Sequence, residues 1–323
     1  MQPSEILFQD ECKPVTIPVC DHYAGSERLM RKSMTLQHEL GPVFDITFDC
    51  EDGAAAGNEE AHAHLIAALV NSPGNRFNRI GARVHDVTSA HFQNDLKIIC
   101  GSSAARLAYV VMPKVRNVQD VEDAIELANL HARQAGRNNL PVHVLIETHG
   151  ALADAHKIAA IPQVECLSFG IMDFVSSHYG AIPAAAMRSP GQFSHPLVMR
   201  AKLEIAAACH AYGKVPSHNV TTEIRDIAVA ANDAQRAKME FGYTRMWSIH
   251  PEQIKPIVSA FAPTNTEIDK ASRILAAAEA AGWGPIQMDG ELHDRASYRY
   301  YWTVLERTKS GNQSLTDTSA EVQ

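Results

Sequence analysis

The sequence predicts an α/β fold, a (β/α)8 TIM barrel followed by a C-terminal helical extension. Eight short runs rich in Val, Ile and Leu alternate with helix-length stretches, as they do in a parallel barrel. The 323 residues leave room for one large barrel and an additional segment. Polar and charged residues follow the apolar runs, and in such a barrel the active site lies at these strand ends.

The expected strands are short apolar runs, and the stretches between them have helical patterns. The strands are expected at residues 16–21, 43–48, 78–86, 107–114, 142–147, 164–174, 214–220 and 244–251. The helices named from their patterns are expected at residues 27–40, 59–70, 117–136, 151–161, 197–213, 226–241 and 251–261. The segment 176–196 is rich in Gly, Pro and Ser and is long for a connection, so we expect it to form an active-site loop.

Three parts of the chain are expected from composition and pattern. Residues 1–262 form the TIM-barrel catalytic domain, and residues 263–308 form a helical C-terminal segment that exceeds what a barrel requires. In that segment, Thr264 and Glu267 have the spacing of a capping box at a helix start. Residues 309–323 are polar and are expected to be a disordered tail.

Composition and charge exclude several classes of protein. A hydrophobic content of 46% and a charged content of 20% indicate a soluble globular protein, and the net charge of −8 argues against a nucleic-acid or membrane-surface partner. No apolar run approaches the roughly 20 residues that span a bilayer. The six cysteines are scattered without C-x-x-C spacing, and the N-terminus lacks the order of a signal peptide, so we expect a cytoplasmic protein.

Two carboxylates follow neighbouring expected strands. Glu147 closes the run VHVLI, and Asp173 follows the run VECLSFGIM. The ends of parallel strands meet at one face of the fold, and oxygen ligands suit a hard cation such as Mg²⁺. The alternative is that each acid caps the helix that follows, since helix N-termini favour acidic residues.

The strand ends read, in order, DCEDG, RVH, MPK, ETHGA, FGIMD and SIHPEQI. This series resembles the citrate lyase beta-subunit and malyl-CoA lyase family, within the HpcH/HpaI aldolase superfamily. The resemblance covers residues 17–275 by the order of elements. It implies a TIM barrel with a C-terminal lid that lies over a neighbouring subunit, and so a homo-oligomer, a trimer or hexamer. Residues 263–308 would then be the lid and oligomerisation segment.

The resemblance also implies a Mg²⁺-dependent carbon–carbon lyase of the aldolase type. Such enzymes cleave or form the bond between an enolate and a 2-oxo acid or other carbonyl compound. By position, Glu147 and Asp173 match the two metal-ligand carboxylates of the family. Arg83 matches the arginine that grips the substrate's carboxylate and carbonyl oxygen, although without the resemblance it could be a surface residue. A divalent ion stabilises the charge that develops on oxygen during such a cleavage.

The resemblance implies further site residues at the same end of the barrel, where the strands finish. Asp49, Glu51 and Asp52 match an acidic motif that supports water or metal near the site, so Glu51 is a candidate for substrate binding and Asp52 for catalysis. Asp289, or less well Asp294, matches a general acid carried by the C-terminal segment.

Three other strand-end residues have open roles. Lys114 is a substrate contact or the solvated start of a helix. His149 contacts the substrate or a neighbouring loop. His218 takes part in proton transfer or is a hydrogen-bonded structural residue.

Departures from the family bear on the substrate. The family has an Arg-Ser before the first strand where this chain reads CKPVTIP, and it has cationic residues where this chain has Glu59 and, further on, Ala63 or His64. The groups that would hold the phosphates of coenzyme A are therefore changed, although the helix at 27–40 could supply substitutes. We expect a small acidic substrate, with a CoA thioester as one candidate. A thioester hydrolase and a non-catalytic metal-binding paralogue are the alternatives.

Overall fold

The computed structural model describes residues 3–8 and 14–309, and the chain divides into two compact units. One unit is Pro18–Phe261, and the other joins the described residues before Pro18 to those from Ala262 on. The sequence had assigned the first 17 residues to the barrel domain, but the described ones among them, 3–8 and 14–17, group with the C-terminal segment. Of the tail predicted at 309–323, all but its first residue lies outside the described residues.

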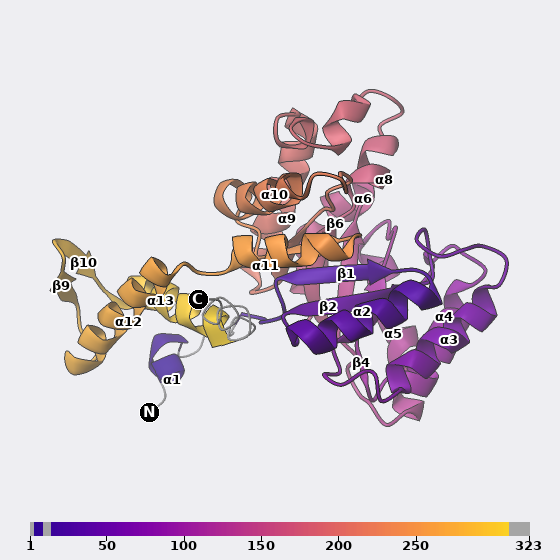
Figure 1. Ribbon diagram of the computed structural model, residues 1–323, viewed down its shortest axis with the longest axis horizontal. Helices are drawn as coiled ribbons and strands as arrows, with labels where there is room; N and C mark the ends of the chain where they lie inside the picture. The colour runs from indigo at the N-terminus through magenta and orange to yellow at the C-terminus, as the bar shows by residue number, and fades with distance from the viewer. Residues whose placement is uncertain (1–2, 9–13, 310–323) are drawn as a thin grey trace, which may run out of the picture. The chain divides into compact units, whose positions relative to one another are not determined.

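In the described part of the chain, eight parallel strands close into a barrel, as the sequence predicts (Figure 1). The closing pair is β8 with β1, in which Met246 lies opposite Cys20. The strands are β1 (Cys20–Ala24), β2 (Phe44–Asp49), β3 (Ile80–Arg83), β4 (Leu107–Met112), β5 (Val142–Ile146), β6 (Val164–Phe169), β7 (Val215–His218) and β8 (Arg245–Ser248).

The first strand begins later than expected. The apolar run at 16–21 predicts a strand there, but β1 starts at Cys20 and continues through Asp21 and Tyr23 to Ala24. The prediction stopped at Asp21 because a charged residue ordinarily ends a buried run. Here that carboxylate is 1% exposed and pairs with Arg245 inside the barrel, so the strand continues past it.

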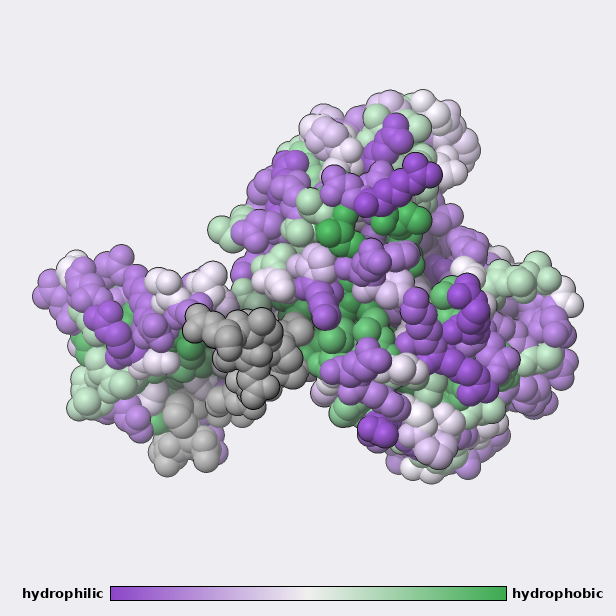
Figure 2. All heavy atoms as spheres, viewed as in Figure 1, coloured by the Kyte–Doolittle hydropathy of each residue, from purple (hydrophilic) through white to green (hydrophobic). Residues whose placement is uncertain are grey.

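Helices cover the outside of the barrel (Figure 1). They bury apolar side chains, as α2 does with Met30 and Met34. On the face shown in Figure 2, hydrophilic side chains predominate, and apolar ones are visible mainly between the barrel's helices. The helices are α2 (Glu27–Leu40), α3 (Glu59–Asn71), α4 (Phe92–Ser103), α5 (Val118–Gln134), α6 (His149–Ala153), α7 (Ala155–Ala160), α8 (Ile171–Ser176), α9 (Pro196–Ala211), α10 (Ile227–Phe241) and α11 (Ile254–Phe261), with short 3₁₀ turns η1 (Ala184–Met187), η2 (Gly191–Phe193) and η3 (Pro251–Gln253). The helix expected at 151–161 is divided into α6 and α7 at Asp154.

The C-terminal unit has its own small core. It contains α1 (Pro3–Phe8), α12 (Asn265–Ala280), the hairpin β9 (Ile286–Met288) and β10 (Glu291–His293), and α13 (Arg295–Lys309). The predicted capping box is present, with Thr264 accepting the N–H of Glu267 at 3.2 Å. Apolar side chains from α1, α12 and α13 pack together: Leu7, Phe8, Ile274, Ala278 and Tyr298. Within the described residues, no helix is long and apolar enough to cross a membrane.

A charged cluster lies inside the barrel. Arg245 is fully buried, with its guanidinium 3.1 Å from Asp21 and 2.7 Å from Asp45. Tyr109 donates its hydroxyl proton to Asp21 at 3.0 Å. Buried charges are stable only when they are paired and hydrogen-bonded, so this cluster ties β1, β2, β4 and β8 together.

Replacing Arg245 by Met is expected to lower the free energy of unfolding by about 3–5 kcal/mol, because Asp21 loses its buried guanidinium partner. Urea denaturation followed by circular dichroism measures the loss. Arg200→Met is the matched control, since it removes an exposed pair with Glu204 at 2.8 Å and should cost less than about 1 kcal/mol. Equal losses for the two variants would contradict a structural role for the buried cluster.

Candidate active site

A cavity of about 410 Å³ lies at the C-terminal ends of the barrel strands. Its polar wall contains side chains from β2, β3 and the segments after β5 and β6, which are Asp49, Asp52, Arg83, Glu147 and Asp173. Its apolar wall comes from β1, α2, α8 and the ends of β7 and β8, and includes Tyr23, Leu29, Met172, Val220, Trp247 and Ile249. The position agrees with the place where barrels of this type carry their chemistry.

Glu147 is the most buried carboxylate in this wall after Asp49, at 3% exposure. Its Oε1 accepts the backbone N–H of Lys114 at 2.7 Å. Gly170 leaves room for it, because a Cβ at that position would lie 2.1 Å from Oε2. Burial, together with the charge of Asp173, raises the pKa of Glu147 from 4.5 to about 8.

Asp173 lies in the first turn of α8 and lines the same cavity as Glu147. The structure therefore brings together the two carboxylates that the sequence singled out. Among the described residues, no group of three or more His, Cys, Asp and Glu side chains has the arrangement of a metal site. Mg²⁺ does not need one, because it commonly takes one or two carboxylates and completes its shell with water or substrate oxygens.

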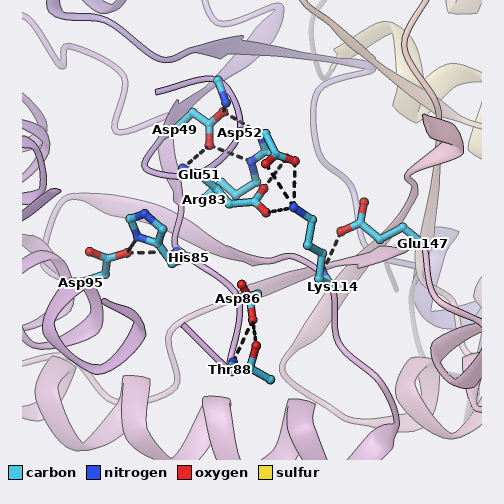
Figure 3. Close-up of polar contacts among 11 residues, drawn as sticks. Asp49, Glu51, Asp52, Arg83, His85, Asp86, Thr88, Asp95, Lys114 and Glu147 are labelled. Carbon is cyan, nitrogen blue, oxygen red and sulfur yellow. Dashed lines mark hydrogen bonds and ion pairs between the residues drawn. The ribbon is translucent and has the colours of Figure 1, made fainter. Parts of the chain in front are cut away.

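Arg83 is held by two carboxylates from β2 and the turn after it (Figure 3). Its Nε donates to Asp49 Oδ1 at 2.7 Å, and a terminal nitrogen donates to Asp49 Oδ2 at 2.5 Å. A second terminal nitrogen lies 3.0 Å from Glu51. Burial by itself would lower the pKa of Arg83, but the adjacent carboxylates raise it, so the guanidinium is a fixed charge.

The sequence analysis gave Asp49 no role of its own, yet this carboxylate accepts more hydrogen bonds than the other acids of the site. It accepts the N–H groups of Glu51 and Gly53 at 2.9 and 2.8 Å as well as the Arg83 fork. Burial opposes its charged form, but Arg83 and these N–H groups together hold its pKa below the ordinary value. The signal available in the sequence was the position of Asp49 at the end of the second expected strand. The structure places it directly opposite Arg83 across β2 and β3.

Lys114 contacts other protein charges, and it is not among the residues that line the described cavity. Its Nζ pairs with Glu51 and, at 2.9 Å, with Asp52 (Figure 3). Burial lowers its pKa, but the two carboxylates outweigh that effect and raise it. These ion pairs are not those of a solvated helix start, and the role of Lys114 as a substrate contact stays a prediction. Its backbone N–H, which positions Glu147, could not be predicted from side-chain type.

The two acids that pair with Lys114 differ in their access to solvent and to the cavity. Glu51 is buried at 6% side-chain exposure between Arg83 and Lys114 and does not line the described cavity. Asp52 lines the cavity and is 58% exposed. Its predicted catalytic role remains a prediction, and so does the substrate-binding role of Glu51.

The two histidines lie away from the described cavity wall. His149 is the first residue of α6, and its Nε2 lies 3.2 Å from the carbonyl oxygen of Ser177, so it contacts the neighbouring loop. His218 is fully buried, with its Nε2 2.7 Å from Nζ of Lys202. Burial holds the pKa of His218 well below its ordinary value, which indicates a structural residue.

The loop at 176–196 was expected to border the site, but none of its residues lines the described cavity. Instead it is anchored beneath the surface. Gln192 is buried and donates to Asp233 at 3.0 Å, and Lys202 donates to Gln192 at 2.8 Å. The length and the Gly and Pro content that predicted an active-site loop do not distinguish such a loop from one fixed by buried polar side chains.

Asp289 belongs to the C-terminal unit. It lies in the turn between β9 and β10 with φ at 52°, is 56% exposed, and pairs with Arg273 at 2.9 Å. Asp294 accepts the N–H of Ala296 at 2.9 Å at the start of α13. The general-acid role of Asp289 stays a prediction.

The predicted sites omitted the apolar floor of the cavity. Tyr23 and Trp247 pack at 4.8 Å between ring centroids and join Val220 in a buried cluster. The signal was strand alternation, which places Tyr23 on the same side of β1 as Asp21 and Trp247 on the same side of β8 as Arg245.

Comparisons with known proteins agree with this geometry. The sequence model described as HpcH/HpaI aldolase/citrate lyase matches residues 34–251. The chain is 28% identical over 279 residues to an L-malyl-CoA/beta-methylmalyl-CoA lyase of Cereibacter sphaeroides, covering 82% of this chain and 87% of that protein. It is 57% identical to the solved structure of a citrate lyase from Burkholderia xenovorans LB400, with a TM-score of 0.86 and 96% coverage of both chains.

The same fold recurs at greater distance. A CitE protein from Mycobacterium tuberculosis, solved in complex with magnesium, acetoacetate and coenzyme A, is 21% identical with a TM-score of 0.70, covering 91% of this chain and 99% of that one. The family match spans most of the barrel, from within α2 to just past β8, and includes the strand-end motifs from DCEDG to FGIMD and the first four residues of SIHPEQI. The chain belongs to the HpcH/HpaI aldolase/citrate lyase family, as its strand-end motifs predicted.

Proposed function

We propose that this chain is a Mg²⁺-dependent carbon–carbon lyase of the aldolase type. It cleaves or forms the bond between an enolate and a 2-oxo acid or other carbonyl compound. The lyase class predicted from the sequence is confirmed by the family match and the names of the relatives. The observation that carries the proposal is that Glu147 and Asp173 line one cavity with Arg83.

The donor set fits a hard divalent cation. Glu147 is buried without an ion-pair partner among the described residues, and its raised pKa reflects burial and the nearby charge of Asp173. A divalent cation between the two carboxylates relieves both effects, because it neutralises their charge where water cannot. When bound there, Mg²⁺ supplies Lewis-acid stabilisation of negative charge developing on a substrate oxygen.

The protein's own groups then bind and orient the substrate. Glu147 is aimed by the Lys114 N–H and by the space at Gly170, which fixes one ligand position. Arg83 is immobilised by Asp49 and Glu51, and its remaining N–H donors are available to a substrate carboxylate. A preorganised guanidinium loses little entropy on binding, so it orients the reacting bond efficiently.

The charges of the cavity point to a small acidic substrate that binds together with the cation. Arg83 is the one cationic side chain among the residues that line the described cavity, against four carboxylates. An anionic substrate therefore depends on Mg²⁺ for much of its attraction. A CoA thioester remains a candidate, in line with the malyl-CoA substrate in the relative's name.

Two properties of the assembled protein are part of the proposal. The homo-oligomer, a trimer or hexamer with the C-terminal segment as a lid, follows from the family resemblance. The cytoplasmic location is supported by the five described cysteines, which are all unpaired and buried.

Mg²⁺ affinity is expected to rise with pH. Below the Glu147 pKa of about 8, Mg²⁺ must displace a proton from that carboxyl, so the affinity should fall by about tenfold per pH unit. Isothermal titration calorimetry at pH 6, 7 and 8 measures this dependence.

Glu147→Gln and Asp173→Asn should each abolish the binding, whereas Glu204→Gln on the exposed face of α9 should leave it unchanged. An unchanged titration in the double variant would exclude the metal site.

The metal-free protein should gain stability at neutral and alkaline pH when Glu147 is replaced by Gln. Between pH 4.5 and about 8 the unfolded state releases a proton that the folded state keeps, so the stability of the wild type falls as pH rises through this window. The variant lacks this loss, so its melting temperature should exceed that of the wild type increasingly up to about pH 8. The melting temperatures of both proteins are measured against pH in the presence of a chelator. A constant difference between wild type and variant over this pH range would refute the burial of an uncompensated carboxyl.

Turnover is tested with malyl-, citramalyl- and citryl-CoA alongside free 2-hydroxy acids. We expect Mg²⁺-dependent release of a 2-oxo acid, lowered by at least about a hundredfold in Glu147→Gln. A hydrazone assay for the 2-oxo acid and a thiol assay for free CoA separate the outcomes. Free CoA alone would indicate thioester hydrolysis, and no turnover with intact Mg²⁺ binding would indicate a non-catalytic paralogue.

A further inference from the structure

We propose that Tyr23 is a substrate-binding residue, whose hydroxyl donates a hydrogen bond to an anionic oxygen of the substrate beside Arg83. This inference rests on the proposed lyase function and adds a donor from the first strand to its site. It also implies that the substrate group in contact with Tyr23 is a carboxylate or an enolate oxygen.

Tyr23 lies in the floor of the cavity. The residue is 8% exposed and lines the same cavity as Glu147 and Asp173. Its ring is fixed on two sides, by Trp247 at 4.8 Å between centroids and by the Arg83 guanidinium 5.3 Å from its centroid. A side chain held in this way cannot turn its hydroxyl to another partner without disturbing the packing.

The hydroxyl makes no hydrogen bond with any residue that the structure describes. Its oxygen is not one of the solvent-inaccessible polar atoms without a partner in the described residues, so it keeps some accessible surface. Because Tyr23 lines the cavity, the hydroxyl opens to it. A largely buried tyrosine ordinarily finds a partner for its O–H. Tyr109, on β4, does so by donating to Asp21. The unused donor of Tyr23 is therefore available to a ligand.

The local charges favour donation to an anion. Burial and the negative charges of Asp21 and Asp49 raise the pKa of Tyr23 well above 10, so the phenol remains protonated at neutral pH. A phenol next to a guanidinium provides two adjacent donors for one anionic group, and charge-assisted hydrogen bonds of this kind are the strong ones. Donors aimed at oxygen charge also stabilise an enolate as it forms.

Tyr23→Phe tests this role because it removes the hydroxyl and keeps the ring. The probe is oxalate, a planar dianion that mimics an enolate, titrated by calorimetry into the protein saturated with Mg²⁺. We expect oxalate affinity to fall by about tenfold to a hundredfold, as loss of a hydrogen bond to a charged group requires. Mg²⁺ affinity and melting temperature should stay at wild-type values, and kcat/KM should fall with oxalate affinity.

Tyr109→Phe is the matched control. It removes a hydroxyl that is bonded to Asp21 within the barrel, so it should lower the melting temperature and leave oxalate affinity within about twofold. Wild-type oxalate affinity in Tyr23→Phe would overturn the role of Tyr23 and leave the lyase proposal intact. An equal loss of Mg²⁺ affinity in Tyr23→Phe would overturn it as well, since the effect would then come from the packing. Failure of the wild type to bind oxalate with Mg²⁺ would overturn both proposals.

Discussion

The site depends on one buried carboxylate. Glu147 is 3% exposed, accepts a single backbone N–H, and has no ion-pair partner in the described chain. Burying an unpaired carboxylate is costly, so the folded protein must either protonate it or neutralise it with a cation. Its surroundings keep both routes open. Gly170 leaves its second oxygen unobstructed, and Asp173 adds a charge that only a cation relieves. The proposed Mg²⁺ site therefore rests on the uncompensated negative charge of Glu147 and Asp173.

The cations at this mouth do not fill that deficit because each is already neutralised. Arg83 is held by Asp49 and Glu51, and Lys114 by Glu51 and Asp52. These pairs form a continuous charged network from β2 to β4, which fixes the geometry and leaves the mouth acidic (Figure 3). Under the proposed function, a rigid acidic mouth would bind an anionic substrate only together with the metal, and that requirement would itself be a form of selectivity.

Sequence reasoning reached the fold and the meeting of Glu147 and Asp173 at one cavity because both leave periodic signals, while the metal-ligand role of the two carboxylates stays a prediction. Apolar runs alternating with helices specify the barrel, and strand-end acids in register specify where Glu147 and Asp173 meet. It placed β1 too early because Asp21 is a charged residue whose partner, Arg245, lies 224 positions away. It left the roles of Lys114 and His149 open, each with a substrate contact as one alternative, because residue type and strand-end position do not reveal the partner. The charge of Lys114 is taken by two acids, and His149 faces the Ser177 carbonyl.

The barrel interior explains how two charge networks coexist in one core. Strand alternation stacks the inward side chains in layers. On β1 and β8, Asp21 and Arg245 form a charged layer, and Tyr23 and Trp247 lie one step closer to the mouth. The intervening layer is mainly apolar, with Tyr23, Val111, Leu145, Val220 and Trp247 packed together.

This apolar layer keeps water away from both sets of charges. Water therefore screens neither set, and each must be balanced by charges close to it. The inner set is balanced by Arg245 and, at Asp45, also by Arg79. Under the proposed function, a cation held by Glu147 and Asp173 would balance the outer set. Tyr23 belongs to the separating layer and lines the cavity, and its hydroxyl makes no hydrogen bond with a described residue, so it is placed to meet the proposed substrate.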